Sequence, residues 1–101
     1  MRYNKLVRNK IPEIIRSKGK TPITHIASDK EYDKKLKEKL IEEVNEFIND
    51  SNIEELVDIL EVINAICENK GVSFDDLEII RMKKLFERGG FDKKIILDSS
   101  E

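Results

Sequence analysis

The sequence contains little cysteine, little histidine and no long apolar run, and these shortages exclude several classes of protein. Its one cysteine, Cys67, rules out an intrachain disulfide, and the apolar run around it is typical of a buried thiol. No stretch approaches the roughly 18 consecutive apolar residues of a membrane helix. The start of the chain also lacks the apolar region of a secretory signal. We therefore expect a cytoplasmic protein with no membrane partner.

The charges are abundant but balanced. Lys and Arg number 19 and Asp and Glu number 21, for a net charge of -2. A general nucleic-acid binder is basic overall, so we expect no nucleic-acid partner. With 101 residues and apolar positions in periodic sets, residues 1–101 are expected to form one domain with a modest core. Pairing with another copy would enlarge that core.

Apolar residues recur at helical spacing in three long stretches. They predict helices over residues 29–48, 53–69 and 73–88. Suitable N-cap pairs stand at their starts: Ser28 with Glu31, Ser51 with Glu54 or Asn52 with Glu55, and Ser73 with Asp76. A shorter helix is expected between Pro12 and Gly19. The expected fold class is all-α, with a tight turn at residues 49–52 that makes the first two long helices antiparallel neighbours.

Two short segments are expected to be extended. Pro22 and the alternation of Ile23 and Ile26 with polar neighbours indicate an edge segment near residues 23–26. Residues 95–97 are apolar and could pair with it. The single histidine, His25, has no partner at metal-ligand spacing, so we expect an exposed or edge-strand side chain.

Two acidic pairs flank the turn at residues 49–52. Glu43 and Glu46 precede it and Glu55 and Asp58 follow it, and the partners of each pair are three positions apart, which places each pair on one helix face. Across a tight turn the four carboxylates can converge, and they repel each other unless a cation lies among them. The pattern favours a Mg²⁺ site, although acidic pairs at this spacing also arise by chance on a solvated face.

The helical positions of the acids predict which of them face a partner helix. Glu43 falls at one edge of the apolar stripe of its helix, whereas Glu42 falls on the opposite, solvated side. Glu55 and Asp58 border apolar positions of the next helix, and Glu61 falls outside them. A carboxylate among apolar neighbours is costly without a partner, which is a reason to expect a role for Glu55 and Asp58.

Basic residues gather before Pro12. The segment contains Arg2, Lys5, Arg8 and Lys10 among apolar residues. It is either a solvated segment with a few apolar anchors or a set of phosphate contacts.

Two further lysines are candidate contacts. Lys39 lies one turn before Glu43, where it could restrain that carboxylate, contact phosphate or form an ordinary helix pair. Lys84 lies in the basic last turns of the third long helix, where cations also suit the helix dipole. The predicted substrate-binding residues are Lys5, Arg8, Lys39 and Lys84.

The apolar set of the helix over residues 53–69 is unusually wide. It comprises Leu56, Val57, Ile59, Leu60, Val62, Ile63, Ile66 and Cys67. One partner helix needs only a stripe, so this width predicts burial on more than one side and at least a dimer.

The acidic motif and both ends of the chain resemble a known family. The pattern Glu-Glu-x-x-Glu at residues 42–46, followed by Glu-x-x-Asp at residues 55–58, resembles the all-α nucleoside triphosphate pyrophosphohydrolases of the MazG type. The opening at residues 3–13 and the ending at residues 84–91, with Arg88-Gly89-Gly90-Phe91, are similar to its phosphoribosyl-ATP pyrophosphohydrolase-like, house-cleaning branch. The likeness covers roughly residues 3–97.

The resemblance implies a helical bundle built by self-association, as a homodimer or homotetramer. It implies hydrolysis of a nucleoside triphosphate to monophosphate and pyrophosphate, with Mg²⁺, or Mn²⁺ in its place. The metal-holding and catalytic residues implied are Glu43, Glu46, Glu55 and Asp58. One motif glutamate or a metal-bound water would supply the nucleophile.

The sequence departs from the family pattern at two places, and two alternative functions are considered. Asn9 occupies a position where an aspartate is expected, and the gap between Glu46 and Glu55 is shorter than in many MazG proteins. The first alternative is a dedicated phosphoribosyl-ATP pyrophosphohydrolase. The second is a non-catalytic helical interaction module whose acids are solvated surface.

Overall fold

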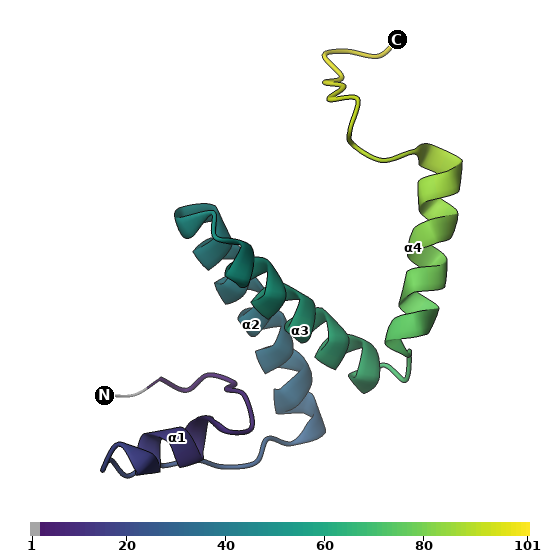
Figure 1. The fold of residues 1–101 in the computed structure, drawn as a ribbon. Coiled ribbons are helices and arrows are strands. Elements are labelled where there is room, and N and C mark those ends of the chain that lie inside the picture. Colours follow the sequence, from purple (N-terminus) through teal and green to yellow (C-terminus); the bar gives the residue numbers. More distant parts are fainter. Residues whose placement is uncertain (1–2) are drawn as a thin grey trace.

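A computed structural model describes residues 3–101, so Arg2 lies outside the described residues. The described residues form four helices, α1 (Ile11–Ser17), α2 (Asp29–Asp50), α3 (Ile53–Asn69) and α4 (Phe74–Arg88) (Figure 1). No strand occurs in residues 3–101. The predicted all-α class is confirmed.

Side-chain caps explain where α2 and α4 begin. The Ser28 hydroxyl accepts a hydrogen bond from the backbone N–H of Glu31 at 3.2 Å. The Ser73 hydroxyl accepts one from the backbone N–H of Asp76 at 3.0 Å. Each bond satisfies a donor that the first helical turn leaves free. Both caps are those predicted from the sequence.

The connection between α2 and α3 is only two residues long. Ser51 follows the last residue of α2 with φ 52°, a left-handed conformation that ends the helix. Asn52 then caps α3, its side-chain oxygen accepting a 3.0 Å hydrogen bond from the backbone N–H of Glu54. Of the two predicted caps for this helix, the structure uses Asn52. The short reversal makes α2 and α3 an antiparallel hairpin.

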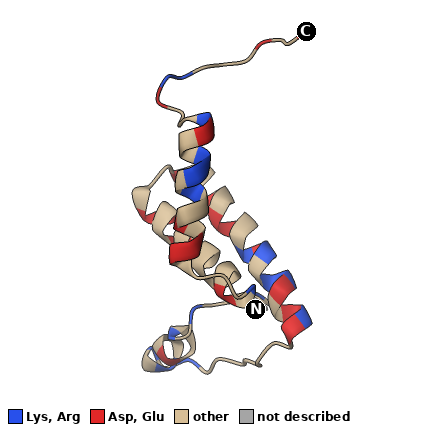
Figure 2. Ribbon diagram, turned by 90° about the vertical axis from the view of Figure 1, so that its right-hand side faces the viewer, with Lys and Arg blue, Asp and Glu red and all other residues tan. Residues whose placement is uncertain are grey.

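The hairpin contains the small core of the described chain. Leu36 of α2 and Val62 and Cys67 of α3 are buried, with 2%, 8% and 7% of their surface exposed. Cys67 is therefore the buried thiol that its apolar surroundings predicted. Charged residues of both signs line α2 (Figure 2), whereas α3 carries acids and no Lys or Arg.

Residues 23–26 and 95–97 were predicted to be extended segments that could pair with each other, and this pairing is wrong. Neither segment forms a strand, and no backbone hydrogen bond joins them within the described chain. Ile23 and Ile26 are 99% and 96% exposed, and residues 95–97 are also exposed. An isolated pair of short strands has no sheet or helix to pack against, so its backbone bonds bring little stability. His25 is exposed, as expected, and its Nε2 lies 2.9 Å from Glu31 Oε1.

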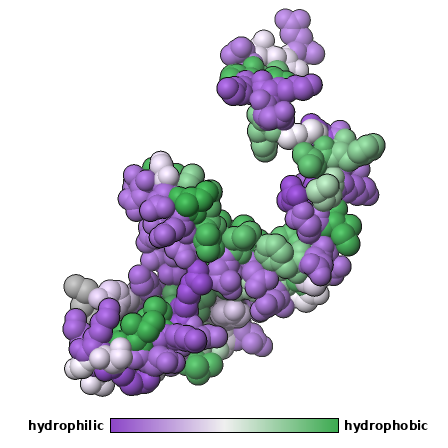
Figure 3. Space-filling view, viewed as in Figure 1, coloured by the Kyte–Doolittle hydropathy of each residue, from purple (hydrophilic) through white to green (hydrophobic). Residues whose placement is uncertain are grey.

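Helix α4 leads away from the hairpin and contacts α3 near their connection (Figure 1). Its apolar residues Ile80, Met82 and Phe86 are 53%, 50% and 93% exposed. A band of apolar side chains runs along the hairpin and continues over α4 (Figure 3). The four helices of one chain therefore do not close into a bundle. None of the described helices is both long and apolar enough to cross a bilayer.

Candidate metal centre

The hairpin brings three of the four motif acids together. Glu43 of α2 and Glu55 and Asp58 of α3 each offer one carboxylate oxygen, and these three oxygens lie within 4.8 Å of one another. Because the connection is two residues long, the end of α2 packs directly against the start of α3. The predicted i, i+3 spacing then turns Glu55 and Asp58 to the same side.

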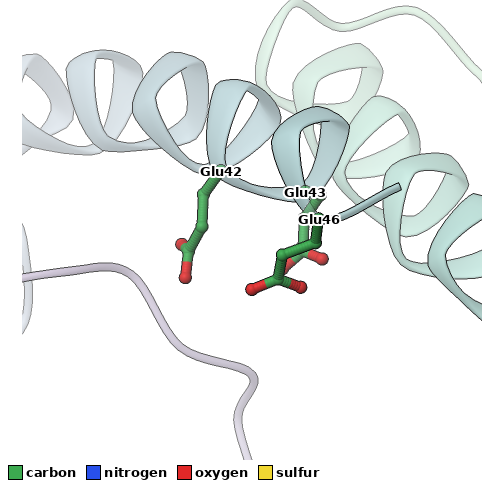
Figure 4. Close-up of side chains that lie close together, drawn as sticks. All are labelled: Glu42, Glu43 and Glu46. Atoms are coloured by element: carbon green, nitrogen blue, oxygen red, sulfur yellow. The ribbon is translucent and has the colours of Figure 1, made fainter. Parts of the chain in front are cut away.

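Glu46, the fourth predicted acid, belongs to a second cluster. Its carboxylate lies within the same 4.8 Å limit of Glu42 and Glu43, and the three side chains leave α2 on one side (Figure 4). Glu46 is exposed. The four motif acids therefore do not meet at one point, and Glu43 is the residue that both clusters share.

Two carboxylate oxygens in the first cluster are buried without a hydrogen-bond partner among the described residues. They are Oε2 of Glu43 and Oε2 of Glu55. Glu43 is only 7% exposed and is the one buried charged residue in the described chain. A buried carboxylate oxygen without a donor costs about 1–3 kcal/mol, and more when the group is charged. A cation bound between the two side chains would satisfy both oxygens.

Lys39 supplies one positive charge to this site. Its Nζ lies 3.2 Å from Glu43 Oε1 and 3.1 Å from Glu42 Oε2. Burial alone lowers the pKa of Lys39, but hydrogen bonds and charge from Glu42 and Glu43 raise it overall, so the amine stays protonated. Both contacts are helix pairs, at i, i+4 with Glu43 and at i, i+3 with Glu42.

The two adjacent glutamates of α2 have opposite protonation tendencies. Burial raises the pKa of Glu43, and the charges of Glu46 and Asp58 raise it further against the effect of Lys39. Burial also acts to raise the pKa of Glu42, but hydrogen bonds from Lys5 and Lys39 lower it overall. Glu43 therefore resists ionisation in the folded chain without a cation, whereas Glu42 favours it.

The basic segment before Pro12 lies against these acids. Arg8 Nη2 donates to Asp58 Oδ1 at 2.7 Å, and Lys5 Nζ donates to Glu42 Oε1 at 3.0 Å. Both pairs join residues far apart in the sequence, so no helical periodicity could reveal them. The structure thus brings Lys5, Arg8 and Lys39 to the acids.

The prediction that Glu42 points into solvent on the opposite side is wrong. Its side chain is 29% exposed and contacts both Lys5 and Lys39. The helical wheel placed Glu42 relative to α3 only, and could not include the N-terminal segment that covers this side of α2. The available signal was Lys39, which lies three residues before Glu42.

A hollow of about 440 Å³ lies beside the first cluster. Residues 6–9 form one wall, and Lys39, Glu43 and Asp58 form part of the others. Volumes of about 300–1,000 Å³ are usual for small-molecule sites. A second hollow of about 570 Å³ beside Asn4 and residues 28–35 contains none of the predicted site residues.

Two further acids line the hollow, one that the sequence placed outside the site and one that it did not identify. Glu61, expected to fall outside, and Glu68 both line it. Glu61 follows Asp58 by three positions, and this spacing could have shown that both lie on the same helix face. Lys84, by contrast, lies on exposed α4 and is not a lining residue of the hollow within this chain.

The donor set suits a hard cation. Mg²⁺ prefers oxygen ligands in octahedral geometry at about 2.0–2.1 Å, so neighbouring ligand oxygens lie about 3 Å apart. The first cluster offers only carboxylate oxygens, two of them buried without a donor. Zn²⁺ usually takes nitrogen or sulfur ligands, which neither cluster offers. Glu43, Glu55 and Asp58 therefore fit Mg²⁺ or Mn²⁺.

Comparisons with known proteins add one relative. A stretch of 41 residues is 54% identical to an uncharacterized protein of Mycolicibacterium smegmatis. That match covers 41% of this chain and 42% of the relative, so it spans less than half of either protein. No family model matches the chain, and no solved structure matches it.

Proposed function

We propose that this chain is a Mg²⁺-dependent nucleoside triphosphate pyrophosphohydrolase of the MazG type, releasing monophosphate and pyrophosphate. The observation that carries the proposal is the cluster of Glu43, Glu55 and Asp58 with two buried oxygens that lack donors. The lysines and arginine beside it supply the positive charge that a triphosphate needs. A house-cleaning role follows from the resemblance of the two ends of the chain.

Glu43, Glu55 and Asp58 would hold the ion, with Glu46 at its edge. When bound, Mg²⁺ supplies charge neutralisation and Lewis-acid polarisation of the triphosphate. Lys39 holds the Glu43 carboxylate through its ion pair, and so orients a buried ligand. Arg8 lines the hollow, and Lys5 pairs with Glu42 beside it; both cations would bind phosphate oxygens of the substrate.

Hydrolysis also requires a group that takes a proton from the attacking water. Water adds to the α-phosphorus, and the bond to the bridging oxygen breaks to release pyrophosphate. Glu46 lies outside the three-acid cluster that would hold the ion, is exposed and forms no ion pair within the described chain, so its carboxylate can accept that proton. Positioning and electrostatic stabilisation then supply most of the rate, as in other phosphoryl transfers.

Self-association is part of the proposal. The chain exposes 9384 Å², whereas a compact monomer of 11.8 kDa exposes about 5,900 Å². Its radius of gyration is 17.8 Å, against about 13 Å for a compact chain of this length. The excess of about 3,500 Å² for one chain is larger than the roughly 1,000–2,500 Å² that each partner of an obligate dimer buries. A homodimer or homotetramer would complete the bundle that one chain leaves open.

The proposal is tested by pyrophosphate release from a panel of canonical and modified nucleoside triphosphates and phosphoribosyl-ATP, with Mg²⁺ and with EDTA. We expect metal-dependent release, reduced about a hundredfold or more by Glu55→Gln and Asp58→Asn, because several kcal/mol of charge stabilisation are lost. Glu54→Gln is the matched control, since Glu54 is an exposed neighbour outside both clusters.

The panel also separates the alternatives. Turnover of phosphoribosyl-ATP alone would favour the dedicated enzyme. No turnover, no nucleotide binding and no stabilisation by Mg²⁺ would favour the interaction module. Full Mg²⁺-dependent activity in both Glu55→Gln and Asp58→Asn would contradict the proposed mechanism.

A further inference from the structure

The N-terminal segment over residues 3–10 is attached to the hairpin through polar contacts. Lys35 Nζ donates to the backbone oxygen of Asn4 at 2.8 Å, Lys5 pairs with Glu42, and Arg8 pairs with Asp58. We call residues 3–10 the N-terminal strap. It passes directly beside the first acidic cluster, because residues 6–9 form a wall of the hollow.

Arg8 bonds to one of the three carboxylates that would hold the ion. Its guanidinium lies 2.7 Å from Asp58 Oδ1, and Asp58 belongs to the cluster with Glu43 and Glu55. Helix α3 has no basic residue of its own, so the strap provides the counter-charge for Asp58. A divalent cation at the cluster brings two positive charges to the same carboxylate, and therefore competes with Arg8.

The Arg8–Asp58 pair is suited to exchange. Its side chains are 53% and 41% exposed, and ion pairs of this kind contribute only about 0–1 kcal/mol. The strap would not leave the site once this pair opens, because the Lys35–Asn4 bond involves neither cluster. Arg8 can thus leave Asp58 and remain close to the hollow.

We propose that the cation displaces Arg8 from Asp58: Arg8 neutralises Asp58 in the chain without metal, and a divalent cation at Glu43, Glu55 and Asp58 releases Arg8 to bind a phosphate oxygen of the substrate. The inference rests on the proposed function. It makes cation and phosphate binding cooperative, because the ion creates the free guanidinium that the anion requires.

The first test measures Mn²⁺ binding to the full chain without nucleotide, by electron paramagnetic resonance. Arg8→Gln removes the competing charge, so the Mn²⁺ dissociation constant should fall about fivefold, the equivalent of an exposed ion pair. Lys10→Gln is the matched control, because it removes the same charge from the same exposed strap and has no ion pair in the described chain. It should change the constant less than Arg8→Gln does.

A second measurement follows Arg8 itself by limited trypsin digestion of the wild-type chain. Trypsin must bind the free side chain to cleave after Arg8, so Mg²⁺ should accelerate cleavage of the Arg8–Asn9 bond. Cleavage after exposed Lys18 in the same chain is the internal reference. The ratio of the two rates should rise with Mg²⁺ in the wild type and stay constant in Glu55→Gln.

The possible outcomes distinguish a failure of the inference about Arg8 from a failure of the proposed metal site. If the wild type binds Mn²⁺ and Arg8→Gln binds it no more tightly than Lys10→Gln, the cation does not displace Arg8 from Asp58, and the metal site stands. Weaker binding in Arg8→Gln would make Arg8 a residue that orients Asp58, which also overturns the inference. If the wild type, Arg8→Gln and Glu55→Gln all bind Mn²⁺ equally, the proposed metal site is wrong. The inference about Arg8 is then wrong as well.

Discussion

At the scale of single residues, Glu42 and Glu43 show how position determines the behaviour of identical side chains. They are neighbours on α2, yet Glu42 gains two lysine partners and Glu43 is buried beside other acids. Partners favour the charged form and burial disfavours it. As pH rises, the contribution of Glu42 to folding stability therefore increases, whereas that of Glu43 decreases.

Glu43→Gln should stabilise the protein at neutral pH in EDTA. The folded-state pKa of Glu43 is raised above its usual 4.5, so its contribution to stability is present at low pH and is lost as pH rises through the folded-state value. A neutral amide avoids that loss. Urea unfolding at pH 7 in EDTA should give a higher midpoint for Glu43→Gln, and addition of Mg²⁺ should remove or reverse the difference.

Glu42→Gln should have the opposite effect. The folded-state pKa of Glu42 is lowered below 4.5, so its contribution is present above that pH and is lost as pH falls through the folded-state value. At pH 7 the loss of its lysine contacts should cost about 0.5–1 kcal/mol. Urea unfolding at pH 7 and at pH 3 measures this, and a difference that persists unchanged at pH 3 would contradict the assignment.

At the scale of elements, the connection between α2 and α3 determines whether the acids meet. Ser51 and Asn52 are the only residues between the helices, so the register of the hairpin depends on where α3 begins. Asn52 sets that point through its side-chain bond to the Glu54 N–H. One more or one fewer helical residue would rotate Glu55 and Asp58 by about 100° relative to Glu43.

Asn52→Ala should therefore weaken both the hairpin and the metal site. Loss of the cap should cost about 1 kcal/mol of unfolding free energy, measured by urea unfolding in EDTA. Mn²⁺ binding should weaken in the same variant. Asn49→Ala provides the control, because Asn49 is exposed near the end of α2 and has no side-chain cap role. Equal stability of the two variants would show that Asn52 does not hold the hairpin.

At the scale of the whole molecule, one chain leaves much apolar surface open to water. Val57 and Leu60 of α3 are 59% and 51% exposed, and Phe86 of α4 is 93% exposed. Figure 3 shows apolar surface on both α3 and α4. Large exposed apolar patches usually mark interaction surfaces. A second copy of the chain would present a band of the same kind.

Leu60→Glu should lower the molecular mass measured by light scattering at micromolar concentration. A charge in the centre of an apolar interface is costly to bury, so the variant should shift from dimer or larger towards monomer and unfold at a lower temperature. Ile23→Glu is the control, because Ile23 is 99% exposed on the segment between α1 and α2. A wild type that is monomeric at this concentration would contradict the proposed self-association.

The sequence by itself determined the local features of the fold. Helical periodicity predicted α3 over residues 53–69 as observed, and the Ser28 and Ser73 caps are those that their neighbours indicated. The spacing of Glu55 and Asp58 predicted their shared face. These features depend on residues within one or two helical turns, so a linear pattern is enough to specify them.

Tertiary structure alone decided the rest of the site. The sequence pattern placed Glu42 in solvent and Glu61 outside, and could not show that Arg8 bonds Asp58, fifty positions away in the chain. The expected pairing of residues 23–26 with 95–97 failed for the same reason, since partners at long range depend on how the helices pack. Contacts between distant residues follow from packing and charge in three dimensions, which periodicity does not contain.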